Sequence, residues 1–330
     1  MAWRRFWSQN HSLNFLGVST LAALRSAVGF GPSIHDRKLN EMIIESDGEQ
    51  FASVSLKGKK SSGKWKPYNQ DAFFYRILDG IRLFGVCDGH GPKGHNVSHH
   101  IAEQISDYVE RTEHEPISSH KLPDEWLQDI VAHTVDDMEQ RTEIETKRSG
   151  STLVFSYIDD RHNVLYTANV GDSRAIVVYR DMSTDWMLST KQLNVEHSPK
   201  VPEEVQRIVD NGGYVGPRGY VSHSNTPYGI NMTRSLGDDD IHWNDIVSSD
   251  PDIMRYQITP QDICFVHGTD GVWDVMDNQE AAAIISNNLP DFKQAAIEIV
   301  NECELRWRKY AGRVDDITIT IYALNDGLVA

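Results

Sequence analysis

A chain of 330 residues is long for one ordinary domain and short for two, so we expect one large domain or a closely joined pair. Hydrophobic residues make up 39% of the chain and charged residues 24%, a globular composition that excludes a disordered or collagen-like protein. The formal net charge of −16 would repel nucleic acid and anionic membrane surfaces, so we expect neither as a partner. That charge also leaves carboxylates to spare for binding metal ions.

Residues 1–35 form a basic segment that we treat as an N-terminal extension of a domain over residues 36–330. Arg4 and Arg5 lie in it, and no acidic residue precedes Asp36. Its apolar stretch, residues 15–24, is too short to cross a bilayer as a helix, so no transmembrane segment is predicted. Residues 1–35 more commonly would form an arm packed on their own domain. In that case we predict a cytoplasmic or nuclear protein. A targeting presequence would instead send the protein to an organelle or the secretory route.

The cysteines are Cys87, Cys264 and Cys303, which are odd in number and widely spaced. This pattern argues against a disulfide framework and against a zinc knuckle. It is typical of a protein in a reducing compartment. Nothing in the sequence indicates an oligomer interface, so we expect a monomer.

Short β-rich runs bounded by Gly, Asp or Asn predict seven strands, at residues 51–56, 82–87, 152–158, 163–170, 174–179, 263–267 and 317–324. Apolar residues at helical spacing predict helices around residues 98–109, 123–138, 277–285 and 292–307. Consecutive strands joined by short polar turns indicate antiparallel pairing, and the helices fall in pairs that would cover sheet faces. The predicted fold class is α+β.

Residues 200–234 are rich in glycine and also contain Pro217 and Pro227. We interpret this stretch as a long loop. Loops of that length are uncommon in compact domains and usually serve a function. Residues 200–234 are therefore a candidate flap.

Aspartates stand where predicted strands begin or end, at Asp88, Asp172, Asp270 and residues 315–316, and Asp71 precedes a further apolar run. Antiparallel strands can place beginnings and ends at one edge of a sheet. Carboxylates gathered there would repel one another unless cations lay between them. Oxygen ligands without cysteine select hard ions, Mg²⁺ or Mn²⁺. A single Asp-Gly pair is ordinarily turn chemistry, so only the whole set predicts a metal site.

Eight motifs follow one another along the chain: NQDA at 69–72, FGVCDGHG at 84–91, SGST at 149–152, ANVGDSRA at 168–175, EHSP at 196–199, TRSLGD at 233–238, TDGVWD at 269–274 and DDI at 315–317. In this order the set resembles the metal-dependent PP2C-type (PPM) serine/threonine protein phosphatases. The resemblance implies a four-layer α-β-β-α sandwich, two antiparallel sheets flanked by helix pairs. It also implies two Mg²⁺ or Mn²⁺ ions in a cleft at one end.

Carried over to matching positions, the resemblance implies that Asp88, Asp270 and Asp315 hold the first ion. Asp88 and the carbonyl of Gly89 would hold the second, so that Asp88 bridges the pair. A hydroxide shared by the ions would attack phosphorus. His90 is placed like the general acid that protonates the leaving serine or threonine oxygen.

Asp172 and Asp274, together with Asp270, resemble the weaker third-metal site of some family members. Asp172 and Asp274 would serve as well as structural groups that bond the neighbouring turns. Asp71 is expected to orient metal-bound waters without touching an ion.

Two positions depart from the family pattern. The common glutamate before Asp71 is Gln70 here, so the second ion loses an anionic neighbour that an amide oxygen or a water would have to replace, and weaker metal affinity is predicted. Lys66 stands where an arginine commonly grips the substrate phosphate. It keeps the positive charge but loses the bidentate fork of the guanidinium.

The leading hypothesis is an Mg²⁺- or Mn²⁺-dependent phosphatase acting on phosphoserine and phosphothreonine in phosphoprotein substrates. The alternative is a pseudophosphatase that keeps the fold and binds partner proteins without turnover, which Gln70 and Lys66 motivate. Retention of Asp88, Asp270 and Asp315 argues against it, because a scaffold has no need of three like charges on one ion. A nuclease is disfavoured by the net charge.

Overall fold

The computed structural model describes residues 42–46, 50–78, 81–112, 122–183 and 188–324. The N-terminal extension, residues 1–35, lies outside these ranges, and its roles stay predictions, as do the compartment and the monomeric state. Within the described ranges, no helix has the length and apolar character needed to cross a membrane.

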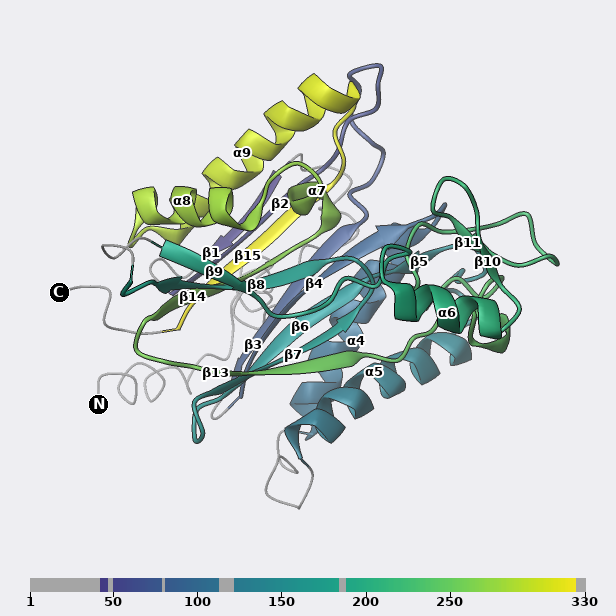
Figure 1. Ribbon diagram of the computed structural model, residues 1–330, viewed down its shortest axis with the longest axis horizontal. Helices are drawn as coiled ribbons and strands as arrows, with labels where there is room; N and C mark the ends of the chain where they lie inside the picture. The colour runs from purple at the N-terminus through teal and green to yellow at the C-terminus, as the bar shows by residue number, and fades with distance from the viewer. Residues whose placement is uncertain (1–41, 47–49, 79–80, 113–121, 184–187, 325–330) are drawn as a thin grey trace, which may run out of the picture.

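Two antiparallel sheets form the middle of the molecule (Figure 1). The first has the order β1 (Met42–Ser46), β2 (Phe51–Leu56), β15 (Ile317–Ala323), β14 (Asp262–Gly268), β8 (Arg174–Arg180) and β9 (Leu188–Gln192). The second has the order β12 (Leu236–Gly237), β5 (Gly150–Ser151), β4 (Ile81–His90), β6 (Leu153–Asp159), β7 (Val164–Val170) and β13 (Asp252–Gln257), with β3 (Asp71–Leu78) paired to β4. All seven predicted strands are present, and their antiparallel pairing is confirmed.

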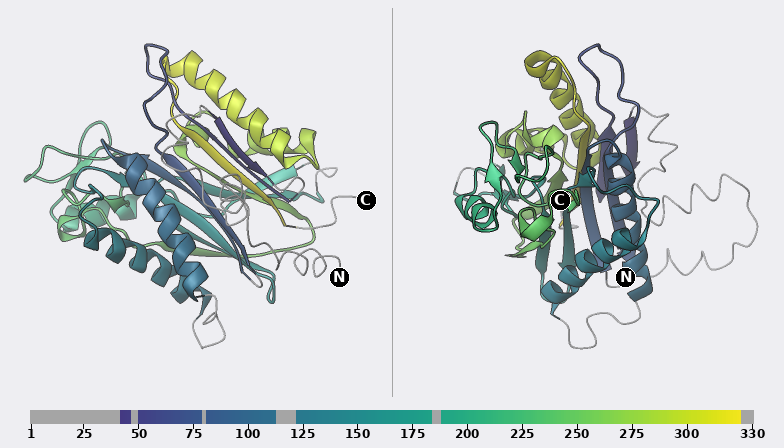
Figure 2. Two further views of the ribbon diagram at one scale, coloured as in Figure 1. Left: turned by 180° about the vertical axis from the view of Figure 1, so that it is seen from behind. Right: turned by 90° about the vertical axis from the view of Figure 1, so that its right-hand side faces the viewer.

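Helix pairs cover the outer faces of the two sheets (Figure 2). On the seven-stranded sheet lie α4 (Gly94–Thr112) and α5 (Pro123–Gln140), and on the six-stranded sheet lie α8 (Asn278–Asn288) and α9 (Phe292–Ala311). A reciprocal capping box begins α8: the Asp277 carboxylate accepts the Glu280 N–H at 2.8 Å, and Glu280 accepts the Asp277 N–H at 2.9 Å. The four-layer α-β-β-α sandwich and the α+β class are confirmed.

The side chains between the two sheets change from apolar to polar along the strands. At one end it is aromatic, with Phe84, Phe265 and Tyr322 packed ring against ring. Toward the other end it becomes polar, and the Ser55 and Thr318 hydroxyls lie 2.7 Å apart. Buried polar groups are stable only when hydrogen-bonded, so their accumulation marks the end of the sandwich where chemistry is expected.

The candidate flap is more ordered than a loop. Residues 202–210 form helix α6 (Pro202–Asp210), so the loop prediction was wrong there, and β10 (Tyr214–Val215) pairs with β11 (Val221–Ser222). Pro202 occupies the first turn, where its missing N–H costs nothing. A small apolar cluster of its own, which includes Ile208, Val221 and Ile230, holds this segment beside η2 (Trp243–Asp245).

Candidate metal centre and catalytic site

The polar end of the sandwich gathers the predicted carboxylates. Asp71 on β3 lies directly opposite Asp88 on β4 in the register. From the other sheet, residues 315–316 immediately precede β15, and Asp270 follows β14 as the first residue of the one-turn helix α7 (Asp270–Trp273). The sheets therefore meet in a single acidic cluster, built from four segments far apart in the sequence.

Burial and mutual repulsion dominate the electrostatics of this cluster. Burial first, and then the neighbouring charges of Asp270 and Asp71, raise the pKa of Asp88 well above its usual value. The pKa of Asp270 is raised in the same way, by burial and by the charges of Asp172 and Asp315. Burial and the charge of Asp316 raise the pKa of Asp71 to about 7. Such shifts mean that the anionic forms lack compensating positive charge.

The residues present fit a hard divalent cation. Within the described ranges, no three His, Cys, Asp or Glu side chains already stand in ligating geometry. The donors are nevertheless oxygens, and Oδ1 of Asp172 is buried with no hydrogen-bond partner among the described residues. A cation would neutralise the repulsion that contributes to the raised pKa values of Asp88 and Asp270. The individual ligand assignments stay predictions.

Gly89 and Gln70 pack the backbone tightly around the N-terminus of α4. The Gly89 N–H donates to the Gln70 carbonyl at 3.1 Å, and a Cβ on Gly89 would stand 2.4 Å from the carbonyl oxygen of Gly94. Only glycine permits this approach. The side-chain amide of Gln70 donates to the Gly91 carbonyl at 2.8 Å, which leaves its own oxygen for a water or an ion.

Lys66 lies against carboxylates. Its Nζ is 2.6 Å from Asp315 Oδ1 and 3.0 Å from Asp316 Oδ2. Burial alone would lower the pKa of Lys66, but the charges of Asp316 and Asp315 outweigh burial and raise it, so the amine is cationic. Its predicted contact with substrate phosphate stays a prediction.

Sequence reasoning assigned no role to Asp316. In the structure, its carboxylate accepts hydrogen bonds from several neighbouring segments. Its carboxylate accepts the Gly58 N–H at 2.7 Å and the Gln70 N–H at 3.1 Å, in addition to the Lys66 amine. Asp316 thereby holds the loops that surround Asp315. The acidic doublet at 315–316 was a visible signal that two carboxylates share this place.

His90 is held by a carboxylate that sequence reasoning also left without a role. Its Nε2 lies 2.6 Å from Oδ2 of Asp238, a fully buried side chain. Burial alone would lower the pKa of His90, but the charge of Asp238 and the hydrogen bond to it raise it above the usual value. The pKa of Asp238 is correspondingly lowered, despite burial, by the His90 charge. The pair therefore favours imidazolium beside carboxylate.

A cavity of about 360 Å³ opens beside the carboxylates. Asp172, Asp270 and Asp274, the three residues of the predicted third-metal site, line one side of it, and Val215 and Arg218 of the candidate flap line another. The structure thus brings the third-metal residues together in one place.

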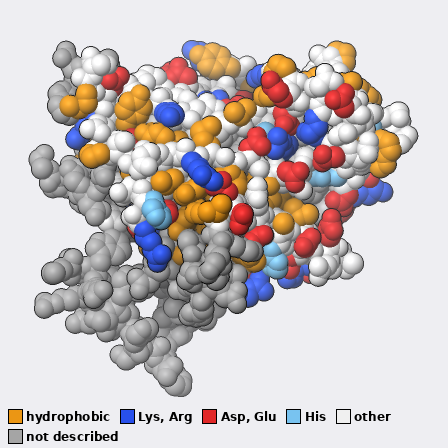
Figure 3. Space-filling view, turned by 60° about the horizontal axis from the view of Figure 1, so that its bottom comes forward, with side chains coloured by type: hydrophobic (Ala, Val, Ile, Leu, Met, Phe, Trp, Pro, Cys, Tyr) orange, Lys and Arg blue, Asp and Glu red, His pale blue; other side chains and the backbone are white. Residues whose placement is uncertain are grey.

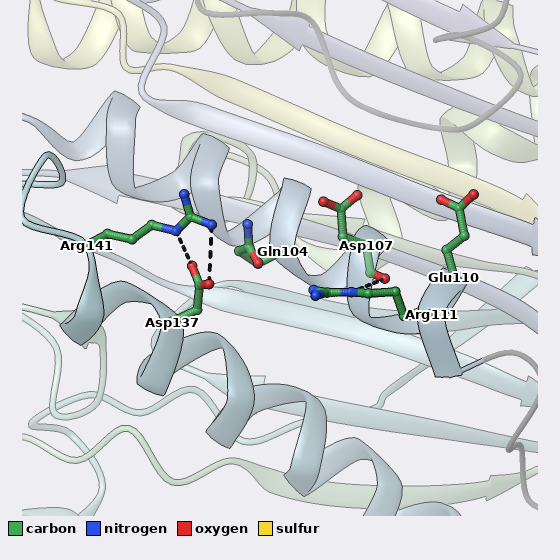
Figure 4. Close-up of a pocket in the computed structure, with 6 residues that line it drawn as sticks. All are labelled: Gln104, Asp107, Glu110, Arg111, Asp137 and Arg141. Atoms are coloured by element: carbon green, nitrogen blue, oxygen red, sulfur yellow. Dashed lines mark hydrogen bonds and ion pairs between the residues drawn. The ribbon is translucent and has the colours of Figure 1, made fainter.

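A second cavity, of about 300 Å³, lies in the helix layer (Figure 4). Residues of α4 line it together with Asp137 and Arg141, which form an ion pair at 2.7 Å. Two of its acidic side chains have ion-pair partners, Asp137 in Arg141 and Glu110 in Arg76 of β3. We assign no chemistry to this cavity. Figure 3 shows acidic side chains gathered toward the right-hand side of one face.

An ion-pair network ties helix α6 to the site. The Glu204 carboxylate contacts Arg234 at 2.6 Å, and Arg234 contacts Asp252 at 2.9 Å. His197 contacts Asp252 through Nε2 at 3.0 Å, and its Nδ1 accepts the N–H of Gly171, the residue before Asp172, at 3.1 Å. The flap and the Asp172 turn are therefore held in one continuous arrangement.

We expect Glu204→Gln to destabilise the protein by about 3 kcal/mol near neutral pH, because it removes the buried carboxylate that pairs with the half-buried Arg207 and Arg234. Arginine neighbours lower the pKa of Glu204 from 4.5 to about 2, although burial alone would raise it. A depressed carboxyl pKa stabilises the fold above the unfolded pKa. The difference between wild type and variant should therefore be constant above about pH 5 and vanish as the pH falls toward 2.

Urea unfolding between pH 7 and pH 3 would measure this difference. Glu203→Gln, at an exposed position on the same helix, is the matched control and should leave stability nearly unchanged. A Glu204→Gln curve parallel to that of the wild type throughout the range would contradict the role of the ion pair.

Comparison with known proteins was made for sequence and for structure. The family described as Protein phosphatase 2C matches residues 64–308. The relative from Arabidopsis thaliana described as probable protein phosphatase 2C 34 is 31% identical over 310 residues, which cover 86% of this chain and 85% of the relative.

Two solved structures share the fold. A serine-threonine phosphatase 2C from Toxoplasma gondii superposes with a TM-score of 0.68 at 20% identity, over 86% of this chain and 99% of that one. A C. elegans sex determining protein superposes with a TM-score of 0.69 at 22% identity, over 85% of this chain and 66% of that one. Because the family match spans most of the chain and agrees with this fold, the chain belongs to the protein phosphatase 2C family.

Proposed function

We propose that this protein phosphatase requires Mg²⁺ or Mn²⁺ and removes phosphate from phosphoserine and phosphothreonine in protein substrates. The observation that carries the proposal is the carboxylate cluster formed by the buried Asp71 and the half-buried Asp88 and Asp270, whose pKa values are raised by burial and by the charges of neighbouring carboxylates. Perturbed carboxylates beside a cavity are typical of a functional site. Family membership supplies the reaction class.

The residues proposed to hold ions follow the family pattern: Asp88, Asp270 and Asp315 for the first, Asp88 and the Gly89 carbonyl for the second, and Asp172, Asp270 and Asp274 for a weaker third. When bound, such ions neutralise phosphate charge and activate water for attack on phosphorus. Asp71 accepts the Thr269 hydroxyl at 2.9 Å and so is held beside Asp270, where it would orient waters. Lys66 keeps Asp315 in place and adds positive charge that attracts the substrate phosphate.

His90 is the proposed general acid. Asp238 holds Nε2, and Nδ1 is buried with no hydrogen-bond partner among the described residues, so Nδ1 is the ring nitrogen proposed to carry the proton to the leaving group. As water forms the new bond to phosphorus, the old P–O bond breaks and its electron pair stays on the serine or threonine oxygen. That oxygen takes the Nδ1 proton and leaves as an alcohol.

We expect turnover of a phosphothreonine peptide to fall by about a hundredfold or more when EDTA removes divalent ions, because the carboxylate cluster then lacks its cations. Added Mn²⁺ should restore it. Phosphate release and circular dichroism, measured in parallel, would separate loss of activity from loss of fold. A folded protein that binds Mn²⁺ but shows no metal-dependent turnover would contradict the proposed phosphatase activity.

One observation favours the pseudophosphatase as the second candidate. The Lys66 ammonium stands 2.6 Å from Asp315, where it supplies part of the positive charge that an ion would bring. A lysine in that place would let the fold persist without turnover. Asp88 and Asp270 have no such basic partner among the described residues, and for this reason we place the enzyme first.

A further inference from the structure

Asp238 connects His90 to the candidate flap. Its Oδ2 contacts His90 Nε2 at 2.6 Å and the Ser235 hydroxyl at 2.8 Å. Its Oδ1 contacts the hydroxyl of Tyr228 at 2.9 Å. Tyr228 belongs to the flap, residues 200–234, and its hydroxyl also lies 3.1 Å from the carbonyl oxygen of Arg148. Both carboxylate oxygens of Asp238 are therefore hydrogen-bonded.

The surroundings of Asp238 leave its side chain little freedom. Its backbone adopts a left-handed conformation with φ 57°, which is unfavourable for a residue with a Cβ. Gly150 packs so closely that a Cβ there would stand 2.2 Å from Asp238 Oδ2. The remaining freedom is rotation of the carboxylate about its last bond. The Tyr228 hydroxyl on Oδ1 opposes that rotation, and the direction of the carboxylate in turn sets the direction of the His90 ring.

We propose that Tyr228 is a positioning residue for proton transfer, through which the flap holds the Asp238–His90 pair in the orientation that protonates the leaving oxygen. The inference rests on the proposed role of His90 as general acid. It gives the flap a part in the chemical step in addition to its part in lining the cavity. Without the Tyr228 hydroxyl, the carboxylate turns and the imidazole loses its alignment.

The test compares two substrates with different leaving groups. Tyr228→Phe should lower kcat about tenfold for a phosphothreonine peptide, whose leaving oxygen needs a proton. For 4-nitrophenyl phosphate, whose leaving group departs as a stable anion, the loss should stay below about twofold. Mn²⁺ binding measured by calorimetry should be unchanged, because the substitution removes no proposed ligand.

Tyr214→Phe is the matched control, since Tyr214 is a half-exposed flap tyrosine on the strand face opposite to Val215, which lines the cavity. It should change neither substrate. The double variant His90→Ala/Tyr228→Phe should lose no more activity toward the peptide than His90→Ala alone, because Tyr228 acts through His90.

Two results would overturn the inference: equal losses for both substrates in Tyr228→Phe, or additive losses in the double variant. These results are distinguishable from failure of the proposed function. If His90→Ala lowers turnover of both substrates equally, the general-acid role fails and the inference fails with it. If His90→Ala is selective for the peptide and Tyr228→Phe is not, only the inference fails.

Discussion

The Asp88→Asn variant is expected to lose metal binding and activity together while its metal-free form becomes more stable than the metal-free wild type. Burial, together with the charges of Asp270 and Asp71, raises the pKa of Asp88. Removing its charge relieves repulsion in the absence of cations, and it deletes the only side chain proposed to touch both ions. Activity should fall by about a thousandfold or more.

The opposite signs of these effects make the prediction specific. An ordinary destabilising substitution would lower stability with and without metal. Asp88→Asn should unfold at a higher temperature than the wild type in EDTA and gain little from added Mn²⁺, whereas the wild type should gain substantially. Thermal unfolding and calorimetric Mn²⁺ titration would measure both.

Asparagine keeps the shape of the side chain, so no cavity confuses the comparison. Asp210→Asn, which removes an exposed carboxylate at the end of α6, controls for the general effect of one negative charge. Wild-type Mn²⁺ affinity in Asp88→Asn would show that Asp88 is not the bridging ligand.

His90→Ala is expected to reduce turnover of a phosphothreonine peptide by about a hundredfold, and to leave turnover of 4-nitrophenyl phosphate within about threefold of the wild type. The reason is the leaving group. A threonine alkoxide is a very poor leaving group without a proton, whereas nitrophenolate leaves unaided. Mn²⁺ binding should be retained, since the His90 ring is bonded to Asp238 and is not a proposed ligand.

Steady-state kinetics on the two substrates and calorimetric Mn²⁺ titration would measure these effects. His162→Ala is a suitable control, because that ring is 73% exposed and bonds only within the turn between β6 and β7. Losses of equal size for the two substrates would show that His90 supports the structure of the site and does not deliver a proton.

The strands and helices that sequence reasoning predicted have strong local patterns. The run at 153–159 is buried along its whole length, and the Asp277–Glu280 pair marks the start of α8 by its chemistry alone. The edge strands β9 and β13 were not predicted. Both mix exposed and half-exposed positions without clean alternation, so their pairing depends on the neighbouring strand and not on their own sequence.

The candidate flap shows the same limit at larger scale. Its glycines and prolines indicated a loop, yet residues 202–210 form a helix with its own apolar cluster. That cluster includes Ile241 and Ile246, which lie beyond the flap in the chain. A local pattern therefore underestimated the order of the segment, because residues outside it complete its core.

The order of the motifs along the chain was sufficient to assign the family and the fold class, since both depend on short local runs of sequence. The same motifs predict the set of metal-binding aspartates. Which carboxylate pairs with each basic side chain of the site was decided by tertiary packing. His90 reaches Asp238 across 148 positions of sequence, and Lys66 reaches Asp315 across 249. The Lys66–Asp315 pair depends on the meeting of the two sheets, and the His90–Asp238 pair depends on the flanking of β5 by β4 and β12 within one sheet. The free energy of these arrangements is distributed over the whole core and is not encoded beside either residue.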